Sequence, residues 1–140
     1  MNIKKYIIGI FVLILVMTMA ACGDGLKPTQ NEEQAQESKA MYHKISQEEA
    51  KERIDNGVLF IDVREQDEYD SGHIVGAVLS PVGNIGNDIV NIVKDKDTEI
   101  LIYCRSGNRS KVASDALVQL GYTNVYDFGG INTWPYETEQ

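Results

Sequence analysis

The chain has 140 residues, with 13 lysines and arginines against 21 aspartates and glutamates, so its formal net charge is −8 at pH 7. An acidic surface is a poor match for nucleic acid, and we expect no nucleic-acid partner. Two histidines and two cysteines offer no evident metal-ligand cluster. We therefore expect neither a metal nor another cofactor.

The N-terminus has the layout of an export signal. Two lysines precede an apolar stretch, Tyr6–Ala20, which is short for a membrane-spanning helix of about 20 residues. The run Met19–Cys22 resembles a bacterial lipobox, in which the cysteine is lipidated and becomes the mature N-terminus. We expect a lipoprotein signal peptide over 1–21 and an extracytoplasmic protein anchored to a bacterial membrane through Cys22. The alternative is an uncleaved membrane anchor, which also places the folded part outside the cytoplasm.

Residues 22–41 are rich in Gln, Glu, Asn, Lys and Ser, and this composition predicts a flexible polar tether. About 20 such residues span a root-mean-square distance of roughly 25 Å. The remaining segment, 42–140, is long enough for one small domain with a single core. We expect that domain to be a monomer.

Helical and strand patterns alternate through this domain. The pattern predicts, in chain order, a helix from Ser46 to about Gly57, a strand over 58–63, a helical turn over 67–69, a short strand over 77–79, a helix over 82–93, a strand over 100–103, a helix after Ser110 that stops at Gly121, and a strand over 125–128. Such alternation predicts an α/β fold, with a small parallel sheet flanked by helices on both faces. In sheets of this kind the site lies at the carboxyl ends of the strands.

A cysteine stands at the carboxyl end of the strand over 100–103 and opens a loop that leads into the next helix. The loop residues are Cys104, Arg105, Ser106, Gly107, Asn108, Arg109 and Ser110. Backbone N–H groups and the positive end of the helix dipole favour an anion here and lower the pKa of a cysteine. The two arginines are expected to add positive charge. The alternative is a buried structural cysteine, which needs neither two arginines nor a glycine beside it.

If Cys22 carries lipid, Cys104 has no partner for a disulfide within the chain. An unpaired thiol in an exported protein is a candidate reactive group. The absence of a resolving cysteine argues against a thioredoxin-like redox function.

Four segments resemble those of the rhodanese family, in the family's order. Cys104–Arg109 resembles its six-residue active-site loop, and Phe60–Glu65 its strand that ends in Asp-Val-Arg. Gly72–Ala77 resembles its Gly-His-Ile-Pro-Gly-Ala segment, with valine in place of the usual proline, and Gly121–Trp134 resembles its closing segment. The resemblance extends from about residue 42 to 136.

The resemblance implies a rhodanese-like fold and a thiosulfate sulfurtransferase. The Cys104 thiolate would take sulfane sulfur from a small anionic donor such as thiosulfate, and a thiol or cyanide would accept it from the persulfide. The resemblance places the donor against Arg105, Ser106, Gly107, Asn108, Arg109 and Ser110.

Three neighbouring features leave alternatives open. Asp62 and Arg64 support the site either through its electrostatics or, as we prefer, as a buried ion pair at the strand end. His73 is either a general base or, as we prefer, a structural residue in a turn. Arg105 either contacts donor oxygens or faces water.

Two other functions compete with sulfur transfer. Related rhodanese-like phosphatases and arsenate reductases have five residues between the loop cysteine and arginine, whereas four separate Cys104 from Arg109. The second alternative is a membrane-tethered sulfur carrier or docking module without efficient turnover.

Overall fold

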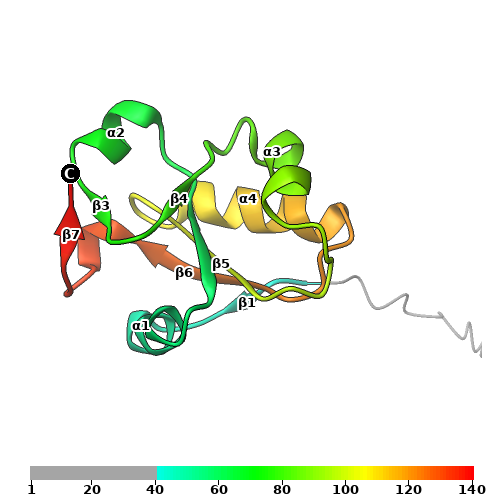
Figure 1. Ribbon diagram of the computed structural model, residues 1–140, viewed down its shortest axis with the longest axis horizontal. Helices are drawn as coiled ribbons and strands as arrows, with labels where there is room; N and C mark the ends of the chain where they lie inside the picture. The colour runs from blue at the N-terminus through cyan, green and yellow to red at the C-terminus, as the bar shows by residue number, and fades with distance from the viewer. Residues whose placement is uncertain (1–40) are drawn as a thin grey trace, which may run out of the picture. The chain divides into compact units, whose positions relative to one another are not determined.

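A computed structural model describes residues 41–140 of the chain (Figure 1). The expected signal peptide over 1–21, the expected lipidation site Cys22 and the tether up to residue 40 lie outside the described residues. Between residues 41 and 140, none of the helices has the length and apolar character needed to cross a bilayer.

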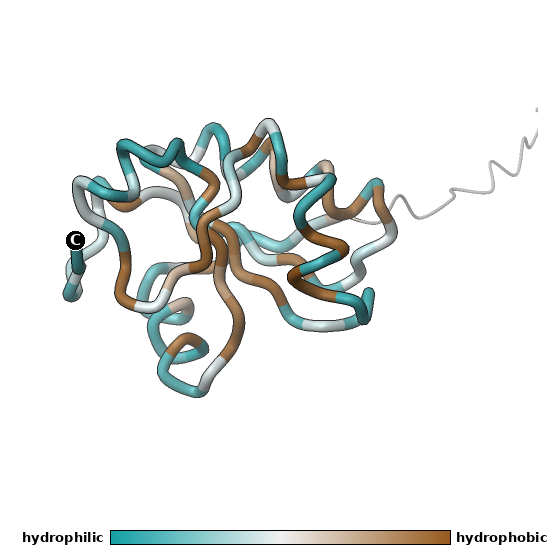
Figure 2. The backbone as a smooth tube through the Cα atoms, turned by 45° about the horizontal axis from the view of Figure 1, so that its top comes forward, coloured by the Kyte–Doolittle hydropathy of each residue, from teal (hydrophilic) through white to brown (hydrophobic). Residues whose placement is uncertain are grey.

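Five parallel strands form the central sheet, in the order β1-β6-β5-β2-β4. The strands are β1 (His43–Lys44), β2 (Leu59–Asp62), β4 (Val78–Leu79), β5 (Ile100–Cys104) and β6 (Val125–Gly130). Every residue of β5 is buried, because this strand lies in the middle of the sheet with both faces covered. Figure 2 shows hydrophobic residues concentrated along the central strands.

Helices cover both faces of this sheet (Figure 1). They are α1 (Gln47–Asp55), α2 (Gln66–Asp70), α3 (Ile85–Ile92) and α4 (Asn108–Gln119). α3 and α4 contribute Ile89 and Leu117 to a mainly aliphatic cluster, whereas α1 contributes Ala50 to a cluster rich in aromatic side chains. The α/β fold with a parallel sheet between helices, predicted from the alternation of patterns, is confirmed.

Helix boundaries follow the local signals. The Ser46 hydroxyl accepts a hydrogen bond from the Glu49 amide at 3.2 Å, which caps the N-terminus of α1. Gly121 follows the end of α4 with a φ of 89°, a left-handed conformation that stops a helix. These ends were predictable because they depend on residues close together in the chain.

The structure differs from the sequence prediction in two places. α4 begins at Asn108 rather than after Ser110, so the last three residues of the expected loop form the first turn of the helix. His73 does not lie in a turn: it begins β3 (His73–Ile74), which pairs antiparallel with β7 (Thr138–Glu139). In addition, the strands β1, β3 and β7 were missed: each has only two residues, too few to show a hydrophobic period, whereas β4 of the same length was predicted over 77–79.

Candidate active site

Cys104 is the last residue of β5 and is only 1% exposed. It lies beside Gly130 of β6, and the pairing of these two strands shifts register between Ile102 and Cys104. This irregularity ends the regular ladder at the point where the chain turns toward α4. The cysteine is therefore held at the carboxyl edge of the sheet, as expected for a site in this class of fold.

The segment Cys104–Ser110, here called the Cys104 loop, curls around the sulfur. The Gly107 amide donates a hydrogen bond to Cys104 Sγ at 3.1 Å. Gly107 caps the N-terminus of α4. Its φ of 99° is a backbone conformation that residues with a side chain rarely adopt. The buried Ser110 hydroxyl donates to the Gly107 carbonyl at 3.0 Å and lies 3.8 Å from Sγ. These contacts hold a backbone amide against the thiol.

The loop favours the ionised form of Cys104. Burial is the largest influence on the thiol and opposes ionisation, but hydrogen bonds from the backbone amides of Ser110, Gly107 and Ser106 together outweigh it. The pKa of Cys104 is therefore lowered below its usual value. Backbone dipoles, rather than a neighbouring base, account for this shift.

The end of β6 supports the loop from the other side. The Asn132 amide, within the 3₁₀-helix η2 (Ile131–Thr133), donates to the Arg105 carbonyl at 3.1 Å. A Cβ on Gly130 would lie 2.3 Å from that carbonyl oxygen, so only glycine permits this approach. The sequence prediction did not assign Gly130 this role, although paired glycines at a strand end are a signal for close backbone contact.

Arg109 is ion-paired with a residue that the sequence prediction missed. Its two guanidinium nitrogens donate to the Glu68 carboxylate of α2 at 2.5 and 2.8 Å. The hydrogen bonds from Arg109 are the main cause that lowers the pKa of Glu68 to about 2. Glu68 thus neutralises the charge of Arg109, whereas the sequence analysis expected Arg109 to add positive charge to the loop. Sequence spacing gives no signal for this contact, which joins residues 41 positions apart.

Asp62 and Arg64 form a buried ion pair at the carboxyl end of β2. Arg64 Nη2 donates to Asp62 Oδ2 at 2.7 Å, and the side chains are 6% and 0% exposed. The same guanidinium donates to the Gly72 carbonyl at 2.8 Å. The pair therefore ties the strand end to the loop after α2, which is the role preferred from sequence.

The remaining loop side chains face outward. Arg105, Ser106 and Asn108 are exposed. Within residues 41–140, the Arg105 guanidinium has no ion-pair partner. Arg105 is consequently the arginine of the Cys104 loop whose charge is exposed to solvent and is not neutralised by an ion pair.

Residues 46–136 match the family described as rhodanese-like domain. The chain belongs to that family. Thiosulfate sulfurtransferase PspE of Escherichia coli (strain K12) is 35% identical over 72 residues, which are 51% of this chain and 69% of that protein. Thiosulfate sulfurtransferase GlpE of Pseudomonas entomophila (strain L48) is 35% identical over 104 residues, covering 71% of this chain and 94% of that protein. A solved rhodanese with anions from E. coli superposes with a TM-score of 0.57 at 30% identity, covering 60% of this chain and 99% of that one.

His73 of this rhodanese-like domain has structural contacts of its own. Its ring stacks on Tyr69 with centroids 3.6 Å apart, and its Nδ1 lies 3.0 Å from the Tyr69 carbonyl oxygen. Its Nε2 lies 3.5 Å from the Glu139 carboxylate. These contacts join α2, β3 and β7, and they support the structural interpretation of His73 over the general-base alternative.

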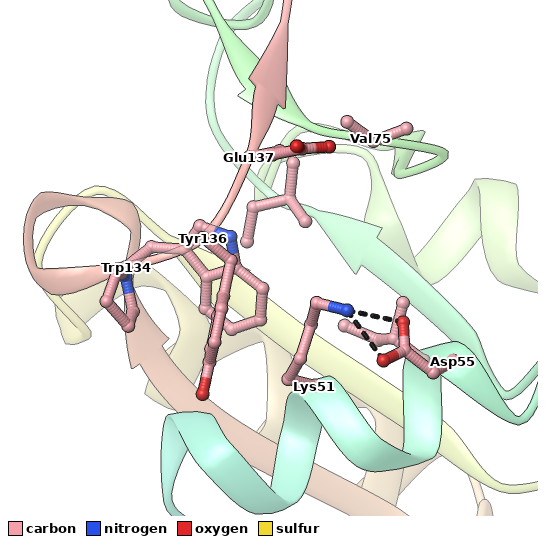
Figure 3. A pocket seen from close by; sticks show the side chains of 9 residues that line it. Lys51, Asp55, Val75, Trp134, Tyr136 and Glu137 are labelled. Atoms are coloured by element: carbon pink, nitrogen blue, oxygen red, sulfur yellow. Dashed lines mark hydrogen bonds and ion pairs between the residues drawn. The ribbon is translucent and has the colours of Figure 1, made fainter.

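A pocket of about 750 Å³ lies beside α1, and its lining contains no residue of the Cys104 loop (Figure 3). Lys51 and Asp55 form an ion pair on one side, and Trp134 and Tyr136 lie on another. The pocket lining contains no cysteine, so the Cys104 loop remains the candidate reaction centre of the rhodanese-like domain. Residues 41–140 contain no group of three or more His, Cys, Asp or Glu side chains arranged to hold a metal ion.

Proposed function

We propose that this rhodanese-like domain is a sulfurtransferase that moves sulfane sulfur through a persulfide on Cys104. The observation that carries the proposal is the 3.1 Å hydrogen bond from the Gly107 amide to Sγ, within a loop that favours the thiolate. The names of two relatives, each a thiosulfate sulfurtransferase at 35% identity, support the same reaction class.

In the first half-reaction the Cys104 thiolate attacks the outer sulfur of a donor such as thiosulfate. A bond forms between Sγ and that sulfur, the sulfur–sulfur bond of the donor breaks, and sulfite leaves with the bonding pair. The product is a Cys104 persulfide whose terminal sulfur is negatively charged. Backbone N–H groups of the loop are suited to stabilise this charge, because they are already oriented and need no reorganisation.

In the second half-reaction cyanide or a thiolate attacks the terminal sulfur. The bond between that sulfur and Sγ breaks and returns its electron pair to Cys104, while the acceptor becomes thiocyanate or a persulfide. The two half-reactions divide one transfer into two steps at a single nucleophile. The low pKa of Cys104 serves both, since the thiolate is the attacking group in the first and the leaving group in the second.

The Cys104 loop from Arg105 to Ser110 forms the proposed donor site. The amides of Ser106, Gly107 and Ser110 act on the sulfur, and we assign the exposed Arg105 to the donor oxygens. Asp62 and Arg64 hold the adjacent strand end in place and make no proposed contact with the donor.

We also propose that the protein is a monomer anchored outside the cytoplasm through lipid on Cys22. The anchor is inferred from the lipobox-like residues alone, and the monomer from the single small domain. Labelling of bacterial cells expressing the wild type and Cys22→Ser with palmitate tests the anchor, and only the wild type is expected to incorporate the label. A wild type that is retained in the membrane without label would indicate an uncleaved anchor instead.

Intact-mass measurement of the purified protein tests the reaction. After incubation with thiosulfate, the wild type should gain the mass of one sulfur atom, cyanide should remove it, and Cys104→Ser should gain nothing. A stable persulfide that cyanide and thiols remove only slowly would indicate a sulfur carrier. Hydrolysis of phosphate esters or reduction of arsenate without sulfur uptake would overturn the proposal.

A further inference from the structure

We propose that Glu68 is a specificity-determining residue that holds Arg109 away from the donor and makes the site favour singly charged sulfur donors over doubly charged ones. This inference rests on the proposed sulfur transfer. It concerns the charge of the donor rather than the identity of the nucleophile.

The Glu68 carboxylate is fixed from two directions. Arg109 donates to both of its oxygens, at 2.5 and 2.8 Å, and the Glu65 amide donates to Oε2 at 3.1 Å. The two side chains of the ion pair are only 31% and 25% exposed. A bidentate pair of this kind fixes the guanidinium in one orientation, because the planar fork of arginine matches the carboxylate.

Arg109 is close enough to the reaction centre for its charge to matter. It lies in the first turn of α4, next to Ser110, whose amide faces Cys104 Sγ. The pKa of Arg109 is raised chiefly by its hydrogen bonds with Glu68, but the negative charge of Cys104 also contributes. A guanidinium that interacts electrostatically with the thiolate also interacts with an anion bound beside it.

The charges around the sulfur nearly cancel. The pairs Asp62–Arg64 and Glu68–Arg109 are each neutral. The Cys104 thiolate and the exposed Arg105 add one charge of each sign, and Glu65 is a further exposed acid whose charge acts on Arg109. The chain as a whole carries a formal charge of −8. The thiolate and Arg105 nearly offset each other for any anion, so the surplus acidic charge leaves a net repulsion that is about twice as large for a dianion such as thiosulfate as for a monoanion.

Two sulfane donors of different charge separate this effect from general changes in catalysis. Thiosulfate carries two negative charges, and methanethiosulfonate carries one. Each transfers its outer sulfur to the thiolate in the same bond exchange, releasing sulfite or methanesulfinate. Steady-state kcat and KM are measured for both donors, with cyanide as acceptor, at low and high salt.

In Glu68→Gln the amide oxygen still accepts from the Glu65 amide, but the charge that neutralises Arg109 is gone. We expect the KM for thiosulfate to fall about three- to tenfold at low salt, the effect of roughly one unit charge a few ångströms away. The KM for methanethiosulfonate should fall by less, and salt should reduce the difference. The double variant Glu68→Gln/Arg109→Gln should not show the fall in thiosulfate KM that Glu68→Gln shows, because the released charge is removed.

Asp67→Asn is the matched control, since Asp67 is an exposed acid on the same helix that is not paired with Arg109. It should change both KM values only slightly, because the charge of Asp67 is exposed to solvent. The inference would be overturned, while sulfur transfer itself stands, by an unchanged thiosulfate KM in Glu68→Gln. A thiosulfate KM that falls as much in Asp67→Asn as in Glu68→Gln would also overturn it. Absence of transfer from both donors in the wild type would instead overturn the proposed function.

Discussion

The carbonyl oxygen of Arg105 occupies the space where a side chain on Gly130 would begin. An ideal Cβ on Gly130 would lie 2.3 Å from that oxygen and 2.6 Å from the Cα of Ser106. Both neighbours are backbone atoms of the Cys104 loop, so neither can rotate away. The shape of the loop therefore depends on a residue of β6 that follows Arg105 by 25 positions in the sequence.

Gly130→Ala should displace the Cys104 loop. We expect the free energy of unfolding to fall by about 1–3 kcal/mol, as for other overpacked sites, with a large loss of sulfur transfer. Urea unfolding and persulfide formation measure the two effects. Gly83→Ala is the control, because a Cβ there meets no atom within 4 Å and should leave both quantities nearly unchanged.

The thiol of Cys104 should ionise below the usual range for cysteine. In a Cys22→Ser background, the rate of alkylation by iodoacetamide should rise with pH around a midpoint lower than that of a free thiol, because loop amides lower the pKa of Cys104. Ser110→Ala removes the hydroxyl that donates to Gly107 and should move the midpoint upward. A midpoint at or above that of free cysteine would contradict the amide argument.

Breaking the buried pair of Asp62 and Arg64 should be costly. Arg64→Met leaves a carboxylate buried without its partner, and we expect a loss of about 3–5 kcal/mol in unfolding free energy. Lys111→Met breaks an exposed pair with Asp115 and should cost far less, because water screens the pair. Similar losses in the two variants would show that burial does not determine the contribution of the Asp62–Arg64 pair.

The ion pair of Glu68 and Arg109 should make stability depend on acid. Arg109 lowers the pKa of Glu68 from 4.5 to about 2 in the folded protein, so the unfolded chain takes up the proton first. The stabilisation is complete above about pH 4.5 and is lost as the pH falls toward 2. Relative to the wild type, Glu68→Gln should be less stable by about 1 kcal/mol at pH 7, with a smaller difference at pH 3 in urea unfolding.

His73 should not contribute to proton transfer. His73→Gln removes the stack on Tyr69 and is expected to lower stability by about 1 kcal/mol. The pH profile of kcat/KM for thiosulfate should keep its shape, since the histidine contacts α2 and β7 rather than the sulfur. If the variant lost the rise or the fall of kcat/KM with pH that the wild type shows, the interpretation of His73 as a general base would be restored.

The local parts of the site were predictable from sequence because neighbouring residues encode them. An apolar run ending in Cys104, a glycine at 107 and helical spacing afterwards predicted the strand, loop and helix, although the helix begins three residues earlier than expected. The alternating patterns likewise predicted the parallel sheet. Three of the four two-residue strands, β1, β3 and β7, escaped detection because such short segments carry no period.

The sequence by itself determined the chemistry available at the site: one thiol at the end of a buried strand, beside two arginines at a helix N-terminus. Only the tertiary structure decided which charges remain free and what supports the loop. Glu68 reaches Arg109, and Gly130 lies against Arg105, because the sheet order brings the carboxyl ends of β2, β5 and β6 to one edge. Contacts between distant residues depend on that strand order and register, which no local pattern specifies.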